Sequence, residues 1–258
     1  MTKEVLRMRV FAGPNGSGKS TIINKVRNYK VNNVPIDFGI YINADLIAKE
    51  LRKGKCSLKK YKITLLEDEF VRIAMDSGLV GNSFNEKLFK SSFKLTDNSI
   101  YLVKLNADEH LAQIIAHVLR KKLLSERKKF SFETVFSHPS KVDIMKEAVK
   151  AGYKVYLYFV STKSPTINQY RVEVRVKQGG HDVPKDKITD RYYRSMNLLH
   201  EASQYAYQAF YFDNSVDGEG KQSLFAHFKL DKDNNKNWDK IDNDIVPDWF
   251  KQYYSNKI

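Results

Sequence analysis

Cysteine and long apolar runs are what this sequence has least of. Its 258 residues include one cysteine, Cys56, so an intrachain disulfide is excluded, and we expect an incidental surface thiol. No stretch approaches the roughly 20 apolar residues of a membrane-spanning helix, and residues 1–4 lack the apolar run of a signal peptide. The sequence therefore predicts a cytoplasmic protein without a membrane partner, long enough to bury a substantial core.

Clusters of metal ligands or of nucleophilic residues are also missing. The six histidines are scattered along the chain and cysteine occurs once, so no group of zinc-type ligands is present. No Ser-His-Asp or Cys-His arrangement can be read from the sequence either.

Acidic residues are scarce relative to basic ones. The chain has 30 of them against 44 lysines and arginines, a net charge of +14. This excess suits nucleotides, nucleic acids, phosphorylated substrates or acidic lipids without choosing among them. Basic residues cluster at 52–62 and 120–129, where the simplest interpretation is a solvated helix face. No DNA- or RNA-binding motif is present, so nucleic acid is not the expected partner.

One glycine-rich segment carries a specific chemical signal: Gly13-Pro14-Asn15-Gly16-Ser17-Gly18-Lys19-Ser20-Thr21. It matches G-x-x-x-x-G-K-[ST] throughout, with an apolar strand pattern before it and a helical pattern after it. Glycines let backbone N–H groups curl around phosphates, and the following helix directs its positive end at the same anion. Lys19 is expected to reach the β- and γ-phosphates, and the Ser20 hydroxyl to ligate Mg²⁺. The segment therefore predicts a site for ATP and Mg²⁺.

Strands alternate with helices over much of the chain. We expect strands at 5–12, 39–43, 130–136, 153–161 and 209–213, and helices at 19–27, 44–52, 140–151, 165–178 and 188–208. This alternation predicts a mainly parallel sheet with right-handed crossovers. The expected fold class is α/β, a P-loop NTPase three-layer sandwich, with the nucleotide at the carboxyl end of the first strand.

The segment between about 53 and 106 interrupts this alternation. It is rich in Lys, Ser and Phe, and we interpret it as a helical insertion after strand two, with a hairpin at 89–105. Beyond Ser215 we expect a polar loop at 217–221, a strand at 223–230 and a helix at 247–254. Since no linker separates independent domains, we expect one P-loop domain over 1–258, with a C-terminal extension at about 217–258.

Two carboxylates follow expected strands. Asp45 could accept a proton from an attacking hydroxyl, or it could cap the next helix, a role that Asn43 could also take. Glu133, followed by Thr134, ends the third strand, where a charged residue in an apolar run is costly unless it is paired or functional. We expect Glu133 to face the site, the alternative being an exposed edge residue.

Arginines gather around a glycine pair. Arg171 and Arg175 lie four residues apart on one expected helix face, and Gly179-Gly180 and then Arg191 and Arg194 follow. Paired guanidinium groups can hold a triphosphate and stabilise charge on the transferred phosphoryl group. The alternative is surface ion pairs, for instance with Glu173 or Asp190. Further on, residues 213–215 could pack near the adenine or form a plain turn.

These segments together resemble the zeta-toxin-like kinases of the P-loop superfamily. The matching segments are Gly-Pro-Asn-Gly-Ser-Gly-Lys-Ser-Thr (13–21), Asn-Ala-Asp-Leu-Ile-Ala (43–48), Phe-Glu-Thr (132–134), Lys-Ala-Gly-Tyr-Lys-Val (150–155), the run from Arg171 to Pro184, and Asp-Asn-Ser (213–215). The resemblance covers roughly 5–50 and 128–216. It implies ATP-dependent phosphorylation of a sugar hydroxyl, with UDP-N-acetylglucosamine as the substrate of toxin members, and an antitoxin protein as a partner.

By this resemblance Asp45 corresponds to the general base, and Glu133 with Thr134 to the substrate-side segment. Arg171 or Arg175, with Arg191, corresponds to the arginines that hold ATP and its γ-phosphate. The chain departs from the family in its insertion, which borders the substrate side, and in Thr134-Val135-Phe136, where Thr-Thr-Leu or Gly-Thr-Leu-Arg is expected. Both departures lie in segments expected on the substrate side, and they therefore bear on which molecule accepts the phosphoryl group.

The leading hypothesis is a kinase that transfers the γ-phosphoryl group of ATP to a hydroxyl of a small molecule, such as a nucleotide sugar. A second hypothesis is a nucleic-acid-binding ATPase. It rests on the net charge of +14 and predicts an affinity for DNA or RNA that falls steeply with salt concentration. A third is a nucleotide-sensing interaction module, which predicts ATP binding without turnover.

Overall fold

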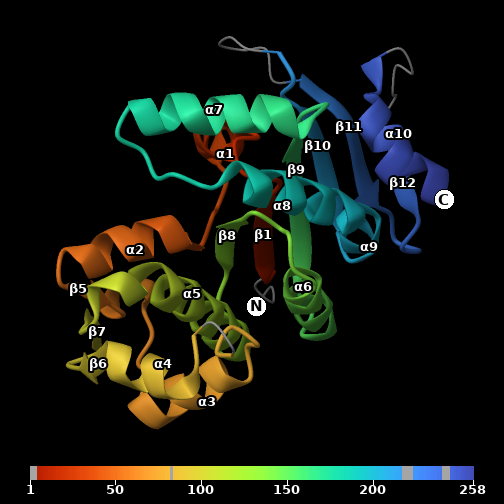
Figure 1. Cartoon of the computed structure of the whole chain (residues 1–258). Coiled ribbons are helices and arrows are strands. Elements are labelled where there is room, and N and C mark those ends of the chain that lie inside the picture. Colours follow the sequence, from red (N-terminus) through yellow and green to blue (C-terminus); the bar gives the residue numbers. More distant parts are fainter. Residues whose placement is uncertain (1–4, 82–83, 217–222, 240–244) are drawn as a thin grey trace. The chain divides into compact units, whose positions relative to one another are not determined.

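The computed structural model describes residues 5–81, 84–216, 223–239 and 245–258. The chain forms two compact units (Figure 1): the first combines Met1–Phe38 with Glu133–Ile258, and the second is Gly39–Phe132. Among the described residues, no helix is both long enough and apolar enough to cross a membrane.

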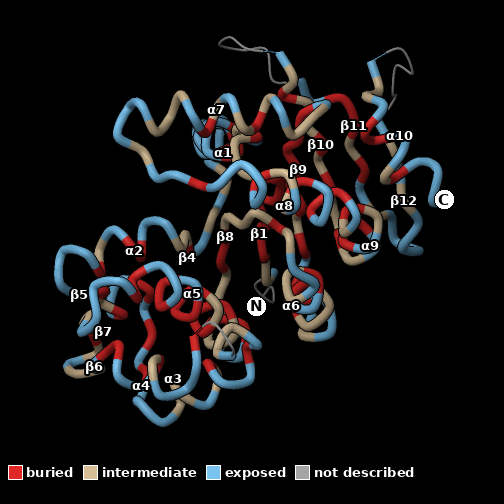
Figure 2. Tube along the Cα trace, in the orientation of Figure 1, coloured by how far each residue is buried: buried red, intermediate tan, exposed pale blue. Residues whose placement is uncertain are grey.

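Five strands of the main sheet lie in the first unit. They are β1 (Arg7–Ala12), β9 (Lys154–Ser161), β10 (Gln208–Asp213), β11 (Ser223–Leu230) and β12 (Lys236–Trp238). β1 pairs with β9 and β9 with β10 in parallel, whereas β11 joins β10, and β12 joins β11, antiparallel. Figure 2 shows buried residues concentrated along β1, β9 and β10, as expected for strands covered on both faces.

Helices connect these strands. They are α1 (Lys19–Asn28), α6 (Ser140–Lys150), α7 (Pro165–Lys177), α8 (Lys185–Asn197), α9 (Leu199–Gln204) and α10 (Asp248–Tyr253), with a small hairpin of β2 (Lys30–Val31) and β3 (Val34–Pro35) after α1. α6 and α9 pack against β9, and α7 packs against α8. The expected α/β class with a mainly parallel sheet and connecting helices is confirmed.

One expected helix is wrong. The pattern at 188–208 predicted a single helix, but the structure has α8 and then α9, separated at Leu198. The two helices have different partners, since α8 packs on α7 and α9 on α6 and β9. The chain must also leave the helical conformation before Gln208, where β10 begins its pairing with Tyr156.

The C-terminal extension contributes to the core of the first unit. Tyr211 of β10 is fully buried, and its ring lies within 4.8 Å of Phe250, 5.6 Å of Tyr254 and 6.1 Å of Trp238. Such aromatic contacts bury large apolar areas. The expected strand at 223–230 and the helix near 247–254 are confirmed, and the polar loop expected at 217–221 lies outside the described residues.

The second unit contains β4 (Ile40–Ile42), which pairs in parallel with Phe130–Phe132 of β8 (Phe130–Thr134). Its helices are α2 (Ala44–Arg52), α3 (Glu67–Met75), α4 (Glu86–Ser92) and α5 (Asp108–Ser125), and α5 packs against both α2 and α3. β5 (Lys55–Ser57), β6 (Phe93–Thr96) and β7 (Ser99–Leu102) form an antiparallel sheet. The hairpin expected at 89–105 is therefore confirmed as β6–β7.

The insertion has an aromatic core of its own. The ring of Phe70 lies 4.9 Å from that of Phe93 and 5.9 Å from that of Phe89, and Phe84 packs on Phe89 at 6.3 Å. All four side chains are buried. This explains the Phe-rich composition that set the segment apart in the sequence.

Cys56 is not a surface thiol, and that expectation is wrong. It lies on β5 with no exposed surface. Because burial disfavours the thiolate, the pKa of Cys56 is raised to about 12.

We therefore expect Cys56 in the native protein to resist a thiol reagent such as DTNB at a pH near the ordinary thiol pKa of about 8.5. The same reagent should titrate one thiol per chain in concentrated urea, which serves as the control. Reaction of the folded protein at the rate of a free thiol would contradict the buried position.

Candidate functional site

The glycine-rich segment connects β1 to α1 and forms a tight loop that excludes side chains at its glycines. Gly13 has φ 142° and Gly16 has φ 73°. A Cβ atom on Gly13 would lie 2.0 Å from the carbonyl oxygen of Val160, and one on Gly16 would lie 2.6 Å from that of Asn168. The backbone of β9 and α7 thus approaches the loop so closely that glycine is required at both positions.

Polar groups converge inside this loop. The ammonium of Lys19 is nearly buried and donates to the carbonyl oxygens of Gly13 and Pro14, each at 2.9 Å. α1 begins directly after Gly18 without a capping side chain, so its first N–H groups are directed at the loop. The buried Asn15 Oδ1 and Ser17 Oγ have no hydrogen-bond partner among the described residues. Unpaired polar atoms and a helix N-terminus fit a bound polyphosphate.

Two buried asparagines hold the loop from outside. Asn168 of α7 donates from Nδ2 to the carbonyl oxygen of Asn15 at 2.6 Å, and its Oδ1 accepts from the hydroxyl of Thr162. Asn214, just after β10, donates from Nδ2 to the carbonyl oxygen of Ser17 at 2.8 Å. Both side chains are at least 95% buried, so these bonds are protected from competing water.

The sequence did not identify these asparagines as site residues. For Asn214 it left open a position near the adenine or a plain turn, whereas its side chain in fact bonds the P-loop. For Asn168, the only signal was a short polar residue in the first turn of an otherwise mixed helix. Neither position could be assigned without knowing that α7 and the end of β10 flank the loop.

Arg171 reaches the same region from α7. Its Nη1 donates to the backbone oxygen of Asn214 at 2.7 Å, so Asn214 connects this guanidinium with the P-loop. Arg171 is positioned by its neighbour Val172, which is buried in a cluster with Val183 and Ile188.

The other arginines of the group have different surroundings. Arg175 donates from Nη2 to the backbone oxygen of His181 at 2.7 Å, which ties α7 to the loop that follows it. Arg194 forms an exposed ion pair with Asp190 within α8, which is the surface alternative that the sequence left open. Arg191 is half-buried on α8. Of the four arginines, Arg171 is therefore the one that the structure brings into contact with residues bonded to the P-loop.

Glu133 lies beside the expected magnesium ligand. The hydroxyl of Ser20 is 3.5 Å from Glu133 Oε1, although the two residues are 113 positions apart. A hydroxyl and a carboxylate are oxygen ligands of the kind that Mg²⁺ prefers. Thr134 instead accepts a hydrogen bond at Oγ1 from the backbone N–H of Phe136 at 3.2 Å.

Asp45 belongs to the second unit, in the first turn of α2. Asn43 is the N-cap, since its Oδ1 accepts from the N–H groups of Asp45 at 2.8 Å and Leu46 at 3.2 Å. The alternative in which Asp45 caps the helix is therefore wrong, because Asn43 already supplies the capping oxygen. The carboxylate of Asp45 is exposed.

Comparison with known proteins places this geometry in a family. The family model described as "Zeta toxin" matches residues 96–229, just over half of the chain. The match includes Glu133, Arg171 and Asn214, and it begins beyond the P-loop and Asp45. An uncharacterized protein of Haemophilus influenzae is 35% identical over 63 residues, which are 24% of this chain and 45% of that protein.

Among solved structures, the AvrRxo1-ORF1:AvrRxo1-ORF2 complex with sulphate ions superposes on this chain with a TM-score of 0.54 at 11% sequence identity. The same complex with ATP superposes with a TM-score of 0.53 at 12% sequence identity. Each covers 98% of this chain, which spans 65% of the matched chain. A chain from the PezAT toxin-antitoxin system of Streptococcus pneumoniae gives 0.47 at 12%, covering 99% of this chain and 80% of the other. At these identities the AvrRxo1 superpositions show the fold.

Sheet, loop and helix define a P-loop protein of the α/β class. The chain belongs to the zeta toxin family, the zeta-toxin-like kinases of the P-loop superfamily.

Asn214→Ala should loosen the P-loop. It leaves the buried carbonyl oxygen of Ser17 without its donor, so we expect the free energy of unfolding in urea to fall by about 1–3 kcal/mol and the Kd for ATP to rise roughly fivefold. Asn237→Ala, at an exposed position on β12, is the control and should change neither quantity. Unchanged stability and ATP affinity in Asn214→Ala would show that the bond to Ser17 does not support the loop.

Proposed function

We propose that the chain is an ATP-dependent kinase that transfers the γ-phosphoryl group to a hydroxyl of a small molecule. The observation that carries this proposal is the convergence of Lys19, Ser20 and Arg171 on one glycine loop. Lys19 and Ser20 lie within the loop, and Arg171 is joined to it through Asn214. Phosphoryl transfer depends mainly on positioning and on stabilising negative charge, and these residues supply both.

On this proposal the cofactor-binding residues are Gly13–Thr21, with Arg171, Arg175 and Arg191 as the arginines for the phosphates. Lys19 would leave the carbonyl oxygens of Gly13 and Pro14 and donate to the β- and γ-phosphate oxygens. Since a lysine ammonium has three donors, it can exchange these contacts without losing all of its bonds. ATP bound to AvrRxo1-ORF1:-ORF2, a complex of the same fold, supports a nucleotide here.

Ser20 is the magnesium ligand that the chain offers, with the Glu133 carboxylate beside it. A magnesium ion at the phosphates supplies charge neutralisation for the leaving group. Glu133, with Thr134, is also the segment that the family resemblance assigns to the substrate side. A carboxylate beside the Ser20 hydroxyl is suited either to orient the metal's water ligands or to accept a hydrogen bond from the substrate.

Asp45 is the proposed general base. Its carboxylate is exposed and is not used as a cap, because Asn43 takes that role. The acceptor oxygen would attack the γ-phosphorus, its proton would pass to Asp45, and the bond from the γ-phosphorus to the bridging oxygen would break to release ADP. UDP-N-acetylglucosamine is the first acceptor to test, on the strength of the family, with the insertion at about 53–106 as the segment that could change this choice.

An antitoxin protein is the proposed macromolecular partner. The PezAT chain belongs to a system described as toxin-antitoxin, and the AvrRxo1 structures are complexes of two products. Membership of the zeta toxin family supports such a partner for this chain. The gene for the antitoxin would be sought beside the gene for this protein, and the antitoxin would be tested for co-purification with this chain.

Lys19→Ala should weaken ATP binding, because it removes a charge that meets two phosphates. We expect the Kd for ATP to rise by about ten- to a hundredfold, as for charged hydrogen bonds of about 1.5–3 kcal/mol. Lys30→Ala, at an exposed position on β2, is the control. An unchanged Kd in Lys19→Ala would place the triphosphate elsewhere.

Asp45→Ala should slow transfer strongly while ATP still binds. With ATP, Mg²⁺ and UDP-N-acetylglucosamine, we expect mass spectrometry to detect a phosphorylated sugar nucleotide and the variant to lower kcat by roughly 10²–10⁴-fold, the usual contribution of a general base. Asp68→Ala, another exposed carboxylate of the second unit, should retain full activity.

Transfer by Asp45→Ala at the unmodified rate would eliminate the base role. If the unmodified protein binds ATP but phosphorylates nothing in an unbiased acceptor screen, the proposal of a kinase fails and a nucleotide-sensing module takes its place.

A further inference from the structure

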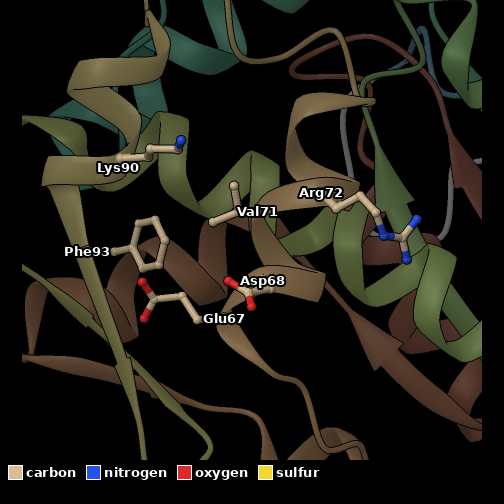
Figure 3. Close-up of a pocket in the computed structure, with 6 residues that line it drawn as sticks. All are labelled: Glu67, Asp68, Val71, Arg72, Lys90 and Phe93. Atoms are coloured by element: carbon tan, nitrogen blue, oxygen red, sulfur yellow. The ribbon is translucent and has the colours of Figure 1, made fainter.

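Two pockets are lined by residues that the proposed transfer does not use. The pocket in Figure 3 lies on the second unit, has a volume of about 340 Å³, and is lined by Glu67, Asp68, Val71, Arg72, Lys90 and Phe93. Its two carboxylates balance its two basic groups, Lys90 pairs with Glu86, and Arg72 points away from Lys90 and Phe93. This balance leaves no excess charge to attract a ligand.

The other pocket, on the first unit, is different in kind. It has a volume of about 490 Å³ and is lined by residues of α9, the turn before β12, β12 itself and the C-terminal segment. Its side chains include His200, Gln204, Lys236 and Trp238, and none of the described side chains that line it is acidic. Lys236 is therefore the charged side chain in this lining.

Lys236 is the central cation of this pocket. Its Nζ donates to Gln204 Oε1 at 3.0 Å and to the hydroxyl of Tyr254 at 3.1 Å, and it lies 5.0 Å from the ring centre of Phe228. These partners are all uncharged, and no carboxylate pairs with Lys236 among the described residues. A lysine ammonium has three donors, so one remains for a ligand. Burial lowers the pKa of Lys236, which shows the cost of keeping this charge without a counter-charge.

His200 contributes a hydrogen-bonding ring rather than a charge. Burial, and then the charges of Lys236 and Lys257, lower its pKa, which favours the neutral imidazole at neutral pH. In the turn before β12, Asp231 uses Oδ1 to accept from the N–H groups of Asp233 and Asn235. An anion that entered the pocket would be attracted by the Lys236 ammonium and would favour protonation of His200.

Neutral groups of the pocket suit the rest of an organic ligand. The exposed amides of Asn234 and Asn235 can donate or accept hydrogen bonds, and the indole of Trp238 is partly exposed. Aromatic rings stack on sugar or base faces, and amides bond to their hydroxyl and carbonyl groups. The pocket thus combines a cation that can bind an anion with an aromatic surface on which the ring of a ligand can stack.

We propose that this pocket, centred on Lys236 between α9, β12 and Tyr254, binds a small organic phosphate such as a sugar phosphate or a nucleoside monophosphate. The phosphate contacts Lys236 and His200, and the ring lies against Trp238. The site is separate from the P-loop in its residues, and its existence does not depend on phosphoryl transfer.

The full chain, labelled with 5-fluorotryptophan, provides a direct test. The sequence has two tryptophans, so ¹⁹F NMR gives two resonances, which Trp238→Phe assigns. Glucose 6-phosphate, UMP, inorganic phosphate and uridine are titrated in turn. We expect a saturable shift of the Trp238 resonance with glucose 6-phosphate or UMP, the two arms identifying the ligand, and none with uridine, which lacks the phosphate.

Lys236→Met keeps the aliphatic stem and should weaken this binding by roughly tenfold or more, as for loss of a charged hydrogen bond. Lys236→Arg should retain binding, and Lys232→Met, at an exposed position in the same turn, is the matched control. An unchanged Trp249 resonance in each variant verifies the fold. The proposal is overturned if neither organic phosphate gives a saturable shift, if uridine binds equally well, if only inorganic phosphate binds, or if Lys236→Met binds as tightly as the unmodified chain.

Discussion

The P-loop of this protein depends on side chains that donate hydrogen bonds to its backbone carbonyl groups. A loop that binds phosphates directs most of its N–H groups at the ligand, so few of them bond the carbonyl groups beside them. In this loop the N–H of Ser17 donates to the carbonyl oxygen of Pro14 at 3.3 Å. Lys19 bonds the oxygens of Gly13 and Pro14, and Asn168 and Asn214 bond those of Asn15 and Ser17. Because the asparagines come from α7 and from the end of β10, the loop acquires its shape only when the sheet and its helices are in place.

The regular elements of the fold could be predicted because local patterns determine them. The expected helix at 44–52 coincides with α2, and the expected strand at 223–230 coincides with β11. The division of 188–208 into α8 and α9 could not be predicted, because it reflects packing against different partners. The burial of Cys56 was missed for a related reason, since only pairing with β7 places it inside.

The site shows the same division between local and long-range information. The P-loop could be read from its motif, because the glycines and Lys19 are adjacent in sequence. The contact of Ser20 with Glu133 and the link from Arg171 through Asn214 to Ser17 join residues separated by 113, 43 and 197 positions. One sequence contains no signal for such pairs. The choice between Asn43 and Asp45 as the helix cap was local and still undecided, because both residue types cap well.

Substitutions in the insertion need not disturb the hydrogen bonds that hold the P-loop. Its aromatic core of Phe70, Phe84, Phe89 and Phe93 is internal to the second unit, as is the ion pair between Lys122 and Glu69. The side chains that bond the P-loop carbonyls described above all come from the first unit. Substitutions at about 53–106 therefore leave the bracing bonds of the loop intact. If the family chemistry is kept, this separation allows the acceptor to change while the residues that bind ATP stay the same, and acceptor identity is then to be sought in the insertion and in Glu133 with Thr134 rather than in the P-loop motif.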